Sequence, residues 1–116
     1  MANRLVSNMY IIDSASTTSP LPYGLVSSVT STWGVATTAN VGKMWVTGVA
    51  VWFSDTTGAI QFALGNTANV VLSYKATGSG NFITSPTPQV DHWEPTTWNG
   101  VFIPLLTACT ATLILV

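Results

Sequence analysis

The chain has 116 residues, of which 47% are hydrophobic and only 6% are charged, whereas an average globular domain has about 25% charged residues. Disorder requires low hydrophobicity together with high charge, so this composition predicts a folded chain. The length suffices for one domain with a core of its own. A net charge of −1 argues against a basic surface for nucleic acid and against a polybasic patch for membranes.

The N-terminal segment, residues 1–13, precedes a loop that contains Pro20 and Pro22. The segment lacks the unbroken apolar stretch of a signal peptide, so we expect no secretion signal. Residues 5–12 predict a strand, but the proline-containing loop can let the segment swing away from the body. We therefore divide the chain into residues 1–13, which form a strand or an assembly arm, and residues 14–116, which form the main domain.

Residues 25–38 predict a threonine-rich strand with a bend at Gly34. The strongest pattern follows in residues 43–75, which predict three consecutive antiparallel strands joined by two tight turns. The first of these strands, residues 44–53, is apolar on both sides of its alternation, so we expect a central strand with both faces buried. In that alternation Trp45 and Trp52 fall on opposite faces, and filling the core is the expected role for either of them.

The two turns in this region have typical turn residues. Residues 55–58 place Asp55 first and Gly58 where a positive φ is needed, and residues 65–68 form the second break. Further along, residues 82–84 predict a short strand. Asn99-Gly100 is a strong signal for a two-residue hairpin between residues 96–98 and 101–103.

The C-terminal segment, residues 101–116, is uncharged and apolar. It is short for a membrane span, and its threonines divide it into two β-like runs, of which residues 111–116 form the last strand. We therefore expect no transmembrane segment. Together these patterns predict an all-β chain, a single antiparallel β-sandwich or jelly-roll-like domain of about seven to nine short strands.

Residues 91–94 contain the only histidine, His92, and two of the four acidic residues. A zinc site needs three or four ligands, and a third would have to come from Asp13, Asp55 or Cys109, a combination that the spacing does not support. Serines are abundant, but no GxSxG motif marks a nucleophile. A surface loop is the simpler interpretation of residues 91–94, and we expect no catalytic residue, no metal and no cofactor. With no second cysteine, Cys109 is expected to be a buried hydrophobic residue.

Aromatic residues near Pro95 are candidates for recognition. Trp93 and Trp98 flank turn-forming residues, so they can serve as exposed stacking surfaces or as anchors of a protein interface. A low-charge surface favours a protein that partners cover. The residues that we expect at an interface are Arg4, Leu5, Met9, Tyr10, Trp93 and Trp98.

The opening MANRLVSNMYIIDSAS, the uncharged threonine-rich body and the ending LTACTATLILV resemble small virion structural proteins of tailed bacteriophages. The first dozen residues carry most of this resemblance, and no functional residue is transferred through it. The resemblance implies a compact β domain that is made in the host cytoplasm and resides in the virion. There it most often decorates or cements the capsid lattice; a place in the tail, the connector or a fibre base is the alternative.

The expected function is therefore that of a non-enzymatic virion protein that forms a homo-oligomer, for example a trimer, and binds the major capsid protein or another virion protein. We expect neither nucleic acid nor membrane as a partner. Two alternatives come from other classes of protein. One is a carbohydrate-binding β-sandwich module with Trp93 and Trp98 as its platform, and the other is a small hydrolase or metal protein built around His92.

Overall fold

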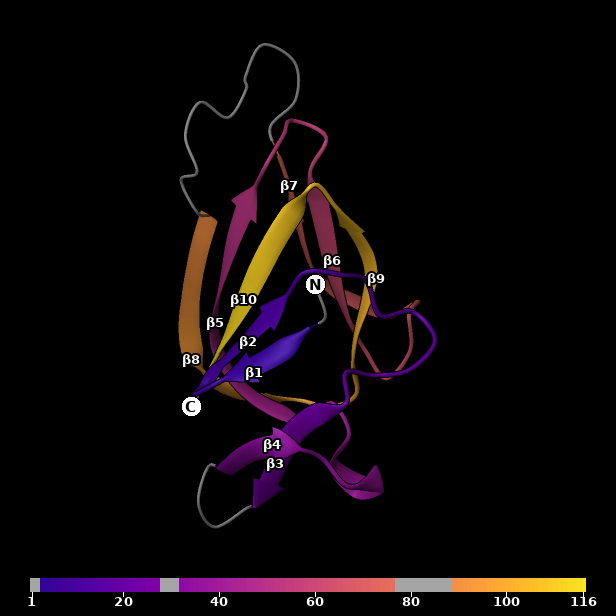
Figure 1. Cartoon of the computed structure of the whole chain (residues 1–116), viewed down its shortest axis with the longest axis vertical. Helices are drawn as coiled ribbons and strands as arrows, with labels where there is room; N and C mark the ends of the chain where they lie inside the picture. The colour runs from indigo at the N-terminus through magenta and orange to yellow at the C-terminus, as the bar shows by residue number, and fades with distance from the viewer. Residues whose placement is uncertain (1–2, 28–31, 77–88) are drawn as a thin grey trace.

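Antiparallel β-strands make up most of the fold. A computed structural model describes residues 3–27, 32–76 and 89–116, and in these ranges it contains ten strands and one 3-10 helix, Thr38–Asn40 (Figure 1). The strands are β1 (Arg4–Val6), β2 (Met9–Ile12), β3 (Tyr23–Ser27), β4 (Thr32–Val35), β5 (Met44–Phe53), β6 (Ala59–Leu64), β7 (Val70–Lys75), β8 (Gln89–Trp98), β9 (Val101–Thr107) and β10 (Cys109–Leu115).

These strands form three antiparallel sheets. The largest has the order β1-β2-β10-β5-β8, the second has the order β7-β6-β9, and β3 pairs with β4 in a separate hairpin. The two larger sheets lie as two layers, and the β3–β4 hairpin lies at one end of them (Figure 1). The prediction of an all-β chain is confirmed, and the described strands outnumber those predicted because two of the predicted strands are hairpins.

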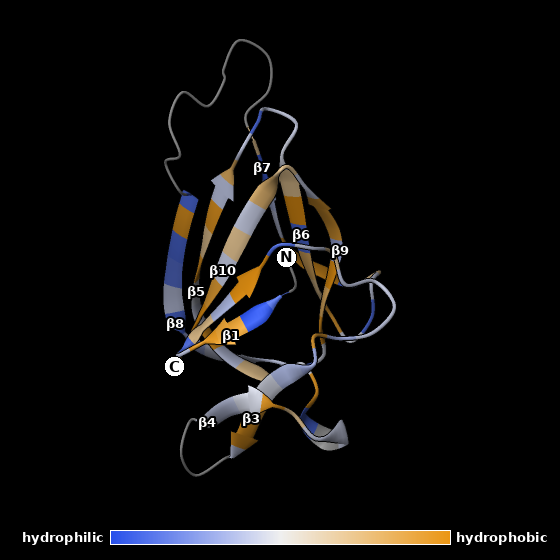
Figure 2. Ribbon diagram, in the orientation of Figure 1, coloured by the Kyte–Doolittle hydropathy of each residue, from blue (hydrophilic) through white to orange (hydrophobic). Residues whose placement is uncertain are grey.

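The two larger sheets share one hydrophobic core. Alternate residues of β10 are buried, from Cys109 to Leu115, and they lie opposite buried residues of β5. Bands of differing hydropathy are visible along β10 (Figure 2). From the other sheet β6 contributes Ile60 and Phe62, and the Phe62 ring lies 5.9 Å from the ring of Trp98 on β8. Burial of this apolar surface is the main source of stability.

The N-terminal segment is a hairpin rather than the single strand predicted for residues 5–12. β1 pairs with β2, and Ser7 turns the chain between them with a φ of 57°. β2 then pairs with β10 of the same chain. Its residues Tyr10 and Ile12 are fully buried in the core, so residues 9–12 are part of the chain's own sheet.

A second hairpin replaces the strand predicted for residues 25–38. β3 pairs with β4 across residues 28–31, which lie outside the described ranges. Backbone hydrogen bonds hold this hairpin to the segment before β5: the Leu25 amide donates to the Lys43 carbonyl at 2.6 Å, and the Gly42 amide donates to the Tyr23 carbonyl at 3.2 Å. The strand predicted for residues 82–84 also lies outside the described ranges.

Two turns that we predicted as hairpins instead carry the chain from one sheet to the other. β5 and β6 belong to different sheets, and so do β8 and β9. The hairpins predicted at residues 55–58 and 99–100 are therefore wrong, whereas the β6–β7 hairpin is confirmed. Gly58 does not have the predicted positive φ; a Cβ there would lie 2.5 Å from Cδ1 of Phe53, so close packing is what requires glycine.

At one end of the two sheets, three turns pack backbone against backbone. Gly42 and Gly100 have φ values of 69° and 64°, which favour glycine. The Gly65 amide donates to the Gly100 carbonyl at 2.9 Å. A Cβ on Gly42 would lie 2.6 Å from the Val101 nitrogen. The glycines thus permit a close approach of segments that are far apart in the sequence.

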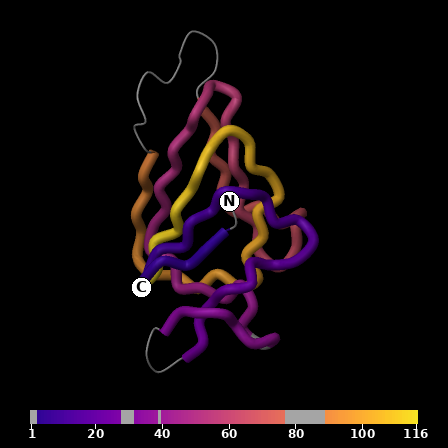
Figure 3. Tube along the Cα trace, in the orientation of Figure 1, coloured from indigo at the N-terminus to yellow at the C-terminus, as the bar shows by residue number. Residues whose placement is uncertain are grey.

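The link from β2 to β3 runs along β9 (Figure 3). Ser16 and Ile103 exchange two backbone hydrogen bonds of 3.0 Å, and the Leu21 amide donates to the Val101 carbonyl at 2.8 Å. The Leu21 side chain is fully buried. This link therefore covers one side of the core.

The apolar C-terminal segment forms β9 and β10, with Ala108 between them at a φ of 46°. The division of this segment into two β runs is thus confirmed. Within residues 3–27, 32–76 and 89–116, the structure has no helix with the length and hydrophobicity that crossing a membrane requires.

The core packing around β5 yields the first prediction. Val49 is fully buried opposite Leu113, so Val49→Asp would place a carboxylate in the core. We expect this variant to lose about 3–5 kcal/mol of unfolding free energy in urea denaturation. The control is Thr110→Asp, at an exposed position of the adjacent strand, which should change stability by less than about 0.5 kcal/mol. Equal stabilities of the two variants would contradict this assignment of the core.

Candidate interaction surface

An interruption in the pairing of β5 decides which of its side chains face solvent. Between Val46 and Gly48 the register with both neighbouring strands shifts, and Thr47 is an extra residue relative to β10. On β8 the interruption coincides with Pro95, which has no backbone N–H for the ladder. The two sides of the gap are joined by side-chain bonds: the Thr47 hydroxyl donates to the Trp93 carbonyl at 2.8 Å, and the Trp93 indole donates to the Val46 carbonyl at 3.0 Å.

This β-bulge reverses the alternation of buried and exposed positions along β5. Met44 and Val46 point into the core before it, and Val49 and Val51 do so after it. As a result Trp45 and Trp52 project from the same, outer face of the sheet, with 42% and 37% of their surfaces exposed. β5 is an interior strand, as predicted, and its outer face is buried at Gly48 and Ala50 but exposed at Trp45 and Trp52. The prediction that either tryptophan fills the core is wrong.

The outer face of the five-stranded sheet is the surface opposite the core. Apart from Arg4 and His92, its register positions carry apolar or small uncharged side chains on adjacent strands. Its exposed large apolar residues are Val6, Met9, Trp45, Trp52 and Val90. Exposed apolar patches of this kind mark interaction surfaces in soluble proteins.

Charged groups lie at the margin of this outer face. Arg4 is on the edge strand β1 and pairs with Asp13, with Arg4 Nη1 2.6 Å from Asp13 Oδ2. Glu94 falls in the irregular part of β8, where the pairing assigns it to neither face. His92 lies opposite Gly48 near the middle of the face. The centre of the outer face therefore offers apolar contact area with little charge to desolvate.

Of the interface residues predicted from the N-terminal segment, Met9 lies on the outer face, with 39% of its surface exposed. Leu5 lies opposite Tyr10 in the β1–β2 ladder and packs against the core, and Tyr10 is fully buried. Leu5 and Tyr10 thus serve the fold itself. Arg4 stays at the edge of the sheet, held by Asp13.

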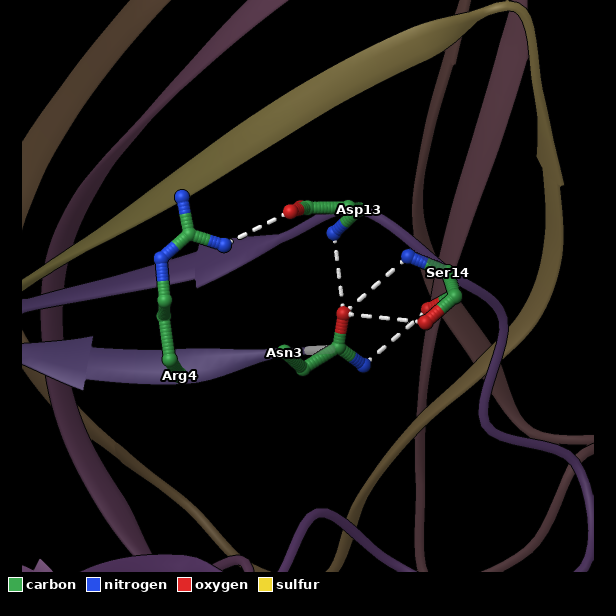
Figure 4. Close-up of polar contacts among 4 residues, drawn as sticks. All are labelled: Asn3, Arg4, Asp13 and Ser14. Carbon is green, nitrogen blue, oxygen red and sulfur yellow. Dashed lines mark hydrogen bonds and ion pairs between the residues drawn. The ribbon is translucent and has the colours of Figure 1, made fainter. Parts of the chain in front are cut away.

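Polar contacts fasten the N-terminal hairpin to the loop that follows it (Figure 4). The Asn3 side-chain oxygen accepts hydrogen bonds from the backbone amides of Asp13 and Ser14, at 2.8 Å and 3.0 Å. The Asn3 amide group donates to the Ser14 carbonyl at 3.0 Å. The Asn3 side chain thereby satisfies backbone amide and carbonyl groups at the end of the β1–β2 ladder.

Trp93 and Trp98, the other two predicted interface residues, lie together. Their rings stack with centroids 6.0 Å apart and planes 23° from parallel. They do not form an exposed platform, because Trp98 is buried in the core and Trp93 is partly buried. Both line a hollow of about 260 Å³ whose other walls are Val71, Leu72 and Thr96. In place of the predicted exposed stacking surface, the structure therefore has a largely apolar hollow lined by the two tryptophans.

Residues 91–94 are part of strand β8, not a surface loop, and their polar side chains point in different directions. Asp91 accepts a hydrogen bond from the Tyr74 hydroxyl, which faces the core side. His92 lies on the outer face. Among the residues that the structure describes, no three His, Cys, Asp or Glu side chains gather as a metal site would require.

Two further ionisable groups have local structural partners. The Asp55 carboxylate accepts hydrogen bonds from the Thr57 hydroxyl and backbone amide, which lower its pKa. The Cys109 thiol is buried near the Ala59 carbonyl, and burial raises its pKa. A raised pKa disfavours the reactive thiolate, as expected for a buried hydrophobic cysteine.

Sequence reasoning missed Trp45 and Trp52 as surface residues because it assumed an unbroken alternation along β5. Pro95 was the available signal, since a proline in a strand implies an interruption in its pairing. Nothing in the sequence indicated that this interruption lies beside Thr47. Comparison of the chain with protein-family models, with curated proteins and with solved structures found no match.

The buried phenols yield the second prediction. The Tyr10 hydroxyl is buried without a hydrogen-bond partner, so Tyr10→Phe should leave stability unchanged or raise it by up to about 1 kcal/mol. Tyr74→Phe is the matched control; it leaves Asp91 without its donor and should cost about 1–3 kcal/mol. Urea denaturation at neutral pH measures both, and a large loss for Tyr10→Phe would show that its hydroxyl has a partner.

The same phenols make the stability of the fold depend on pH in the alkaline range. Burial is the main cause that raises the pKa of both Tyr10 and Tyr74 above the ordinary 10.0, with Tyr23 and Asp91 as the respective secondary causes. As pH rises, the unfolded chain therefore releases these protons before the folded chain does. The contribution of the protonated phenols to the free energy of unfolding is present below pH 10 and is lost as pH rises toward the folded-state pKa. Each Phe variant should show a shallower alkaline decline than the wild type.

The N-terminal hairpin yields the third prediction. Removing residues 1–12 takes away the ladder partner of β10 and two core side chains, Tyr10 and Ile12. We expect an unfolded or aggregated product in circular dichroism and gel filtration. Arg4→Ala is the control and should cost no more than about 1 kcal/mol, because it removes a partly exposed ion pair. A folded, soluble monomer after the deletion would favour the assembly-arm interpretation instead.

Proposed function

We propose that this protein is a non-enzymatic structural component of a tailed-bacteriophage virion and that it decorates the capsid lattice as an oligomer. The observation that carries the proposal is the outer face of the five-stranded sheet, where Trp45, Trp52 and Val90 are exposed. Apolar area with a few large aromatic side chains is what a protein interface uses for affinity. A sheet gives such a surface a fixed shape, so little ordering entropy is lost when a partner binds.

The acidic residues support a structural role. Asp13 binds Arg4, Asp55 binds Thr57, and Asp91 accepts from Tyr74, so three of the four acidic side chains act within the fold. A general acid or base instead needs a carboxyl group directed at a substrate.

The virion is proposed as the partner because the sequence resembles virion proteins. A position in the tail, connector or fibre base is the alternative within this proposal.

We also propose that the architecture is a β-sandwich, with β1-β2-β10-β5-β8 and β7-β6-β9 as its two sheets. The shared core supports this assignment, as do the turns at residues 55–58 and 99–100, which pass from one sheet to the other. A rigid two-layer domain suits a protein that reinforces a shell.

The fourth prediction tests the proposed function. Purified protein is mixed with intact virions of the encoding phage and with their emptied capsids, and each mixture is sedimented through a dense cushion. We expect saturable binding to the capsids, with many copies per particle, and greater resistance of the capsids to heat. Trp52→Lys should weaken binding if the outer face forms the oligomer that binds, whereas Leu105→Lys, on the other sheet, is the matched control.

The outcomes of this experiment separate the alternatives. A few copies per particle, confined to intact virions, would favour a tail or connector position. Failure to bind either particle would contradict the virion proposal. The hollow beside Trp93 and Trp98 favours carbohydrate binding as the second candidate, and quenching of tryptophan fluorescence by oligosaccharides, abolished in Trp93→Ala, would support it.

A further inference from the structure

The outer face has a relief of large and small residues along β5. Trp45 and Trp52 stand at the two ends, and the outward positions between them carry Gly48 and Ala50. A Cβ on Gly48 would lie 2.9 Å from the Asp91 carbonyl oxygen, 3.0 Å from the His92 ring and 3.3 Å from Cδ1 of Ile114, so these groups already fill the space over Gly48. The centre of this strip is therefore buried under its neighbours, and the tryptophans at its two ends are the exposed anchors of the face.

The backbone of β5 and the Trp45 side chain already have hydrogen-bond partners within the chain. β5 is an interior strand, with β10 and β8 on its two sides, so most of its backbone groups are already satisfied. The Trp45 indole N–H donates to the Thr97 hydroxyl. Burying Trp45 under a partner would therefore leave no unpaired N–H, which otherwise is a substantial cost of burying a tryptophan.

The charge of the face selects the kind of partner. A strongly basic or acidic protein would find no opposite charge at the centre, because Arg4 lies at the edge and already pairs with Asp13. A second copy of the same face brings no unmatched charge, and its exposed tryptophans offer apolar contact area of the same kind. A twofold axis makes each face both donor and acceptor of such contacts.

The size of the face is adequate for a specific contact. Strand spacings of about 4.8 Å and rises of about 3.3 Å per residue give the five strands a plane of roughly 500 Å². Two copies would then bury on the order of 1,000 Å², which is near the lower limit for a specific interface. An interface at this limit predicts a weak, reversible dimer.

We infer that the outer face of the five-stranded sheet is a self-association surface, on which a second copy of this chain packs sheet against sheet about a twofold axis. The inference rests on the oligomer in the proposed function and names the surface that forms it. The tryptophans at 45 and 52 are its anchors, and Trp93 and Trp98, on the opposite side of the sheet, take no part.

Sedimentation velocity of the purified chain across the micromolar range is the fifth prediction and the test. We expect a concentration-dependent monomer–dimer equilibrium. Trp52→Lys places two lysines in the symmetric contact and should weaken the dimer by about 100-fold or more. Leu105→Lys is the matched control, since Leu105 is 40% exposed and Trp52 is 37% exposed; it should leave the dimer unchanged.

Several results would overturn the inference: a wild-type protein that stays monomeric over this range, a dimer or trimer that survives Trp52→Lys, or an assembly that Leu105→Lys disrupts equally. Circular dichroism checks that each variant is folded. If Trp52→Lys does not fold, Val90→Lys on the edge strand β8, 43% exposed in the monomer, carries the same test. No capsid is present, so failure here is distinct from failure to bind particles.

Discussion

The arrangement of the five-stranded sheet depends on one interruption in its ladders. Pro95 cannot donate a backbone hydrogen bond, and β5 gains Thr47 as an extra residue at the same level. The Thr47 hydroxyl and the Trp93 indole bridge the gap. Before this point the even-numbered residues of β5 face the core, and beyond it the odd-numbered residues do. The interruption therefore decides which side chains form the core and which two tryptophans reach the surface.

The connections between sheets impose a second constraint. Because β5 is followed by β6 and β8 by β9 in the other sheet, each of these short turns must pass the edge of the core within a few residues. The tight approach of Gly58 to Phe53 and of Gly42 to Val101 follows from that requirement. Close packing thus explains Gly58, whereas Gly42 also has a positive φ that favours glycine.

Several polar side chains among the described residues make their hydrogen bonds within the fold. Asn3 fastens the N-terminal hairpin to the following loop, and Tyr74 binds Asp91 across the two sheets. The outer face, by contrast, combines exposed aromatic area with little charge. The proposed virion role and the proposed self-association both rest on this exposed apolar area.

The sequence by itself determined that the chain is all-β, and it located β5, the β6–β7 hairpin and the two C-terminal strands, because side-chain alternation and turn residues are local properties. It did not determine which strands pair. Asn99-Gly100 has the composition of a hairpin turn, yet β8 pairs with β5 and β9 with β6. The same local turn can serve either connection, and only the packing of the core selects between them.

The candidate surface shows the same limit. Trp93 and Trp98 were expected at an interface from their position beside Pro95, but the core takes up Trp98 and stacks Trp93 against it. Trp45 and Trp52 were assigned to opposite faces from an ideal alternation. The bulge at Thr47, where the pairing with both neighbouring strands shifts, places both on one face. Its contact with Trp93 joins residues 46 apart, and a pattern along a single strand contains no information about such contacts.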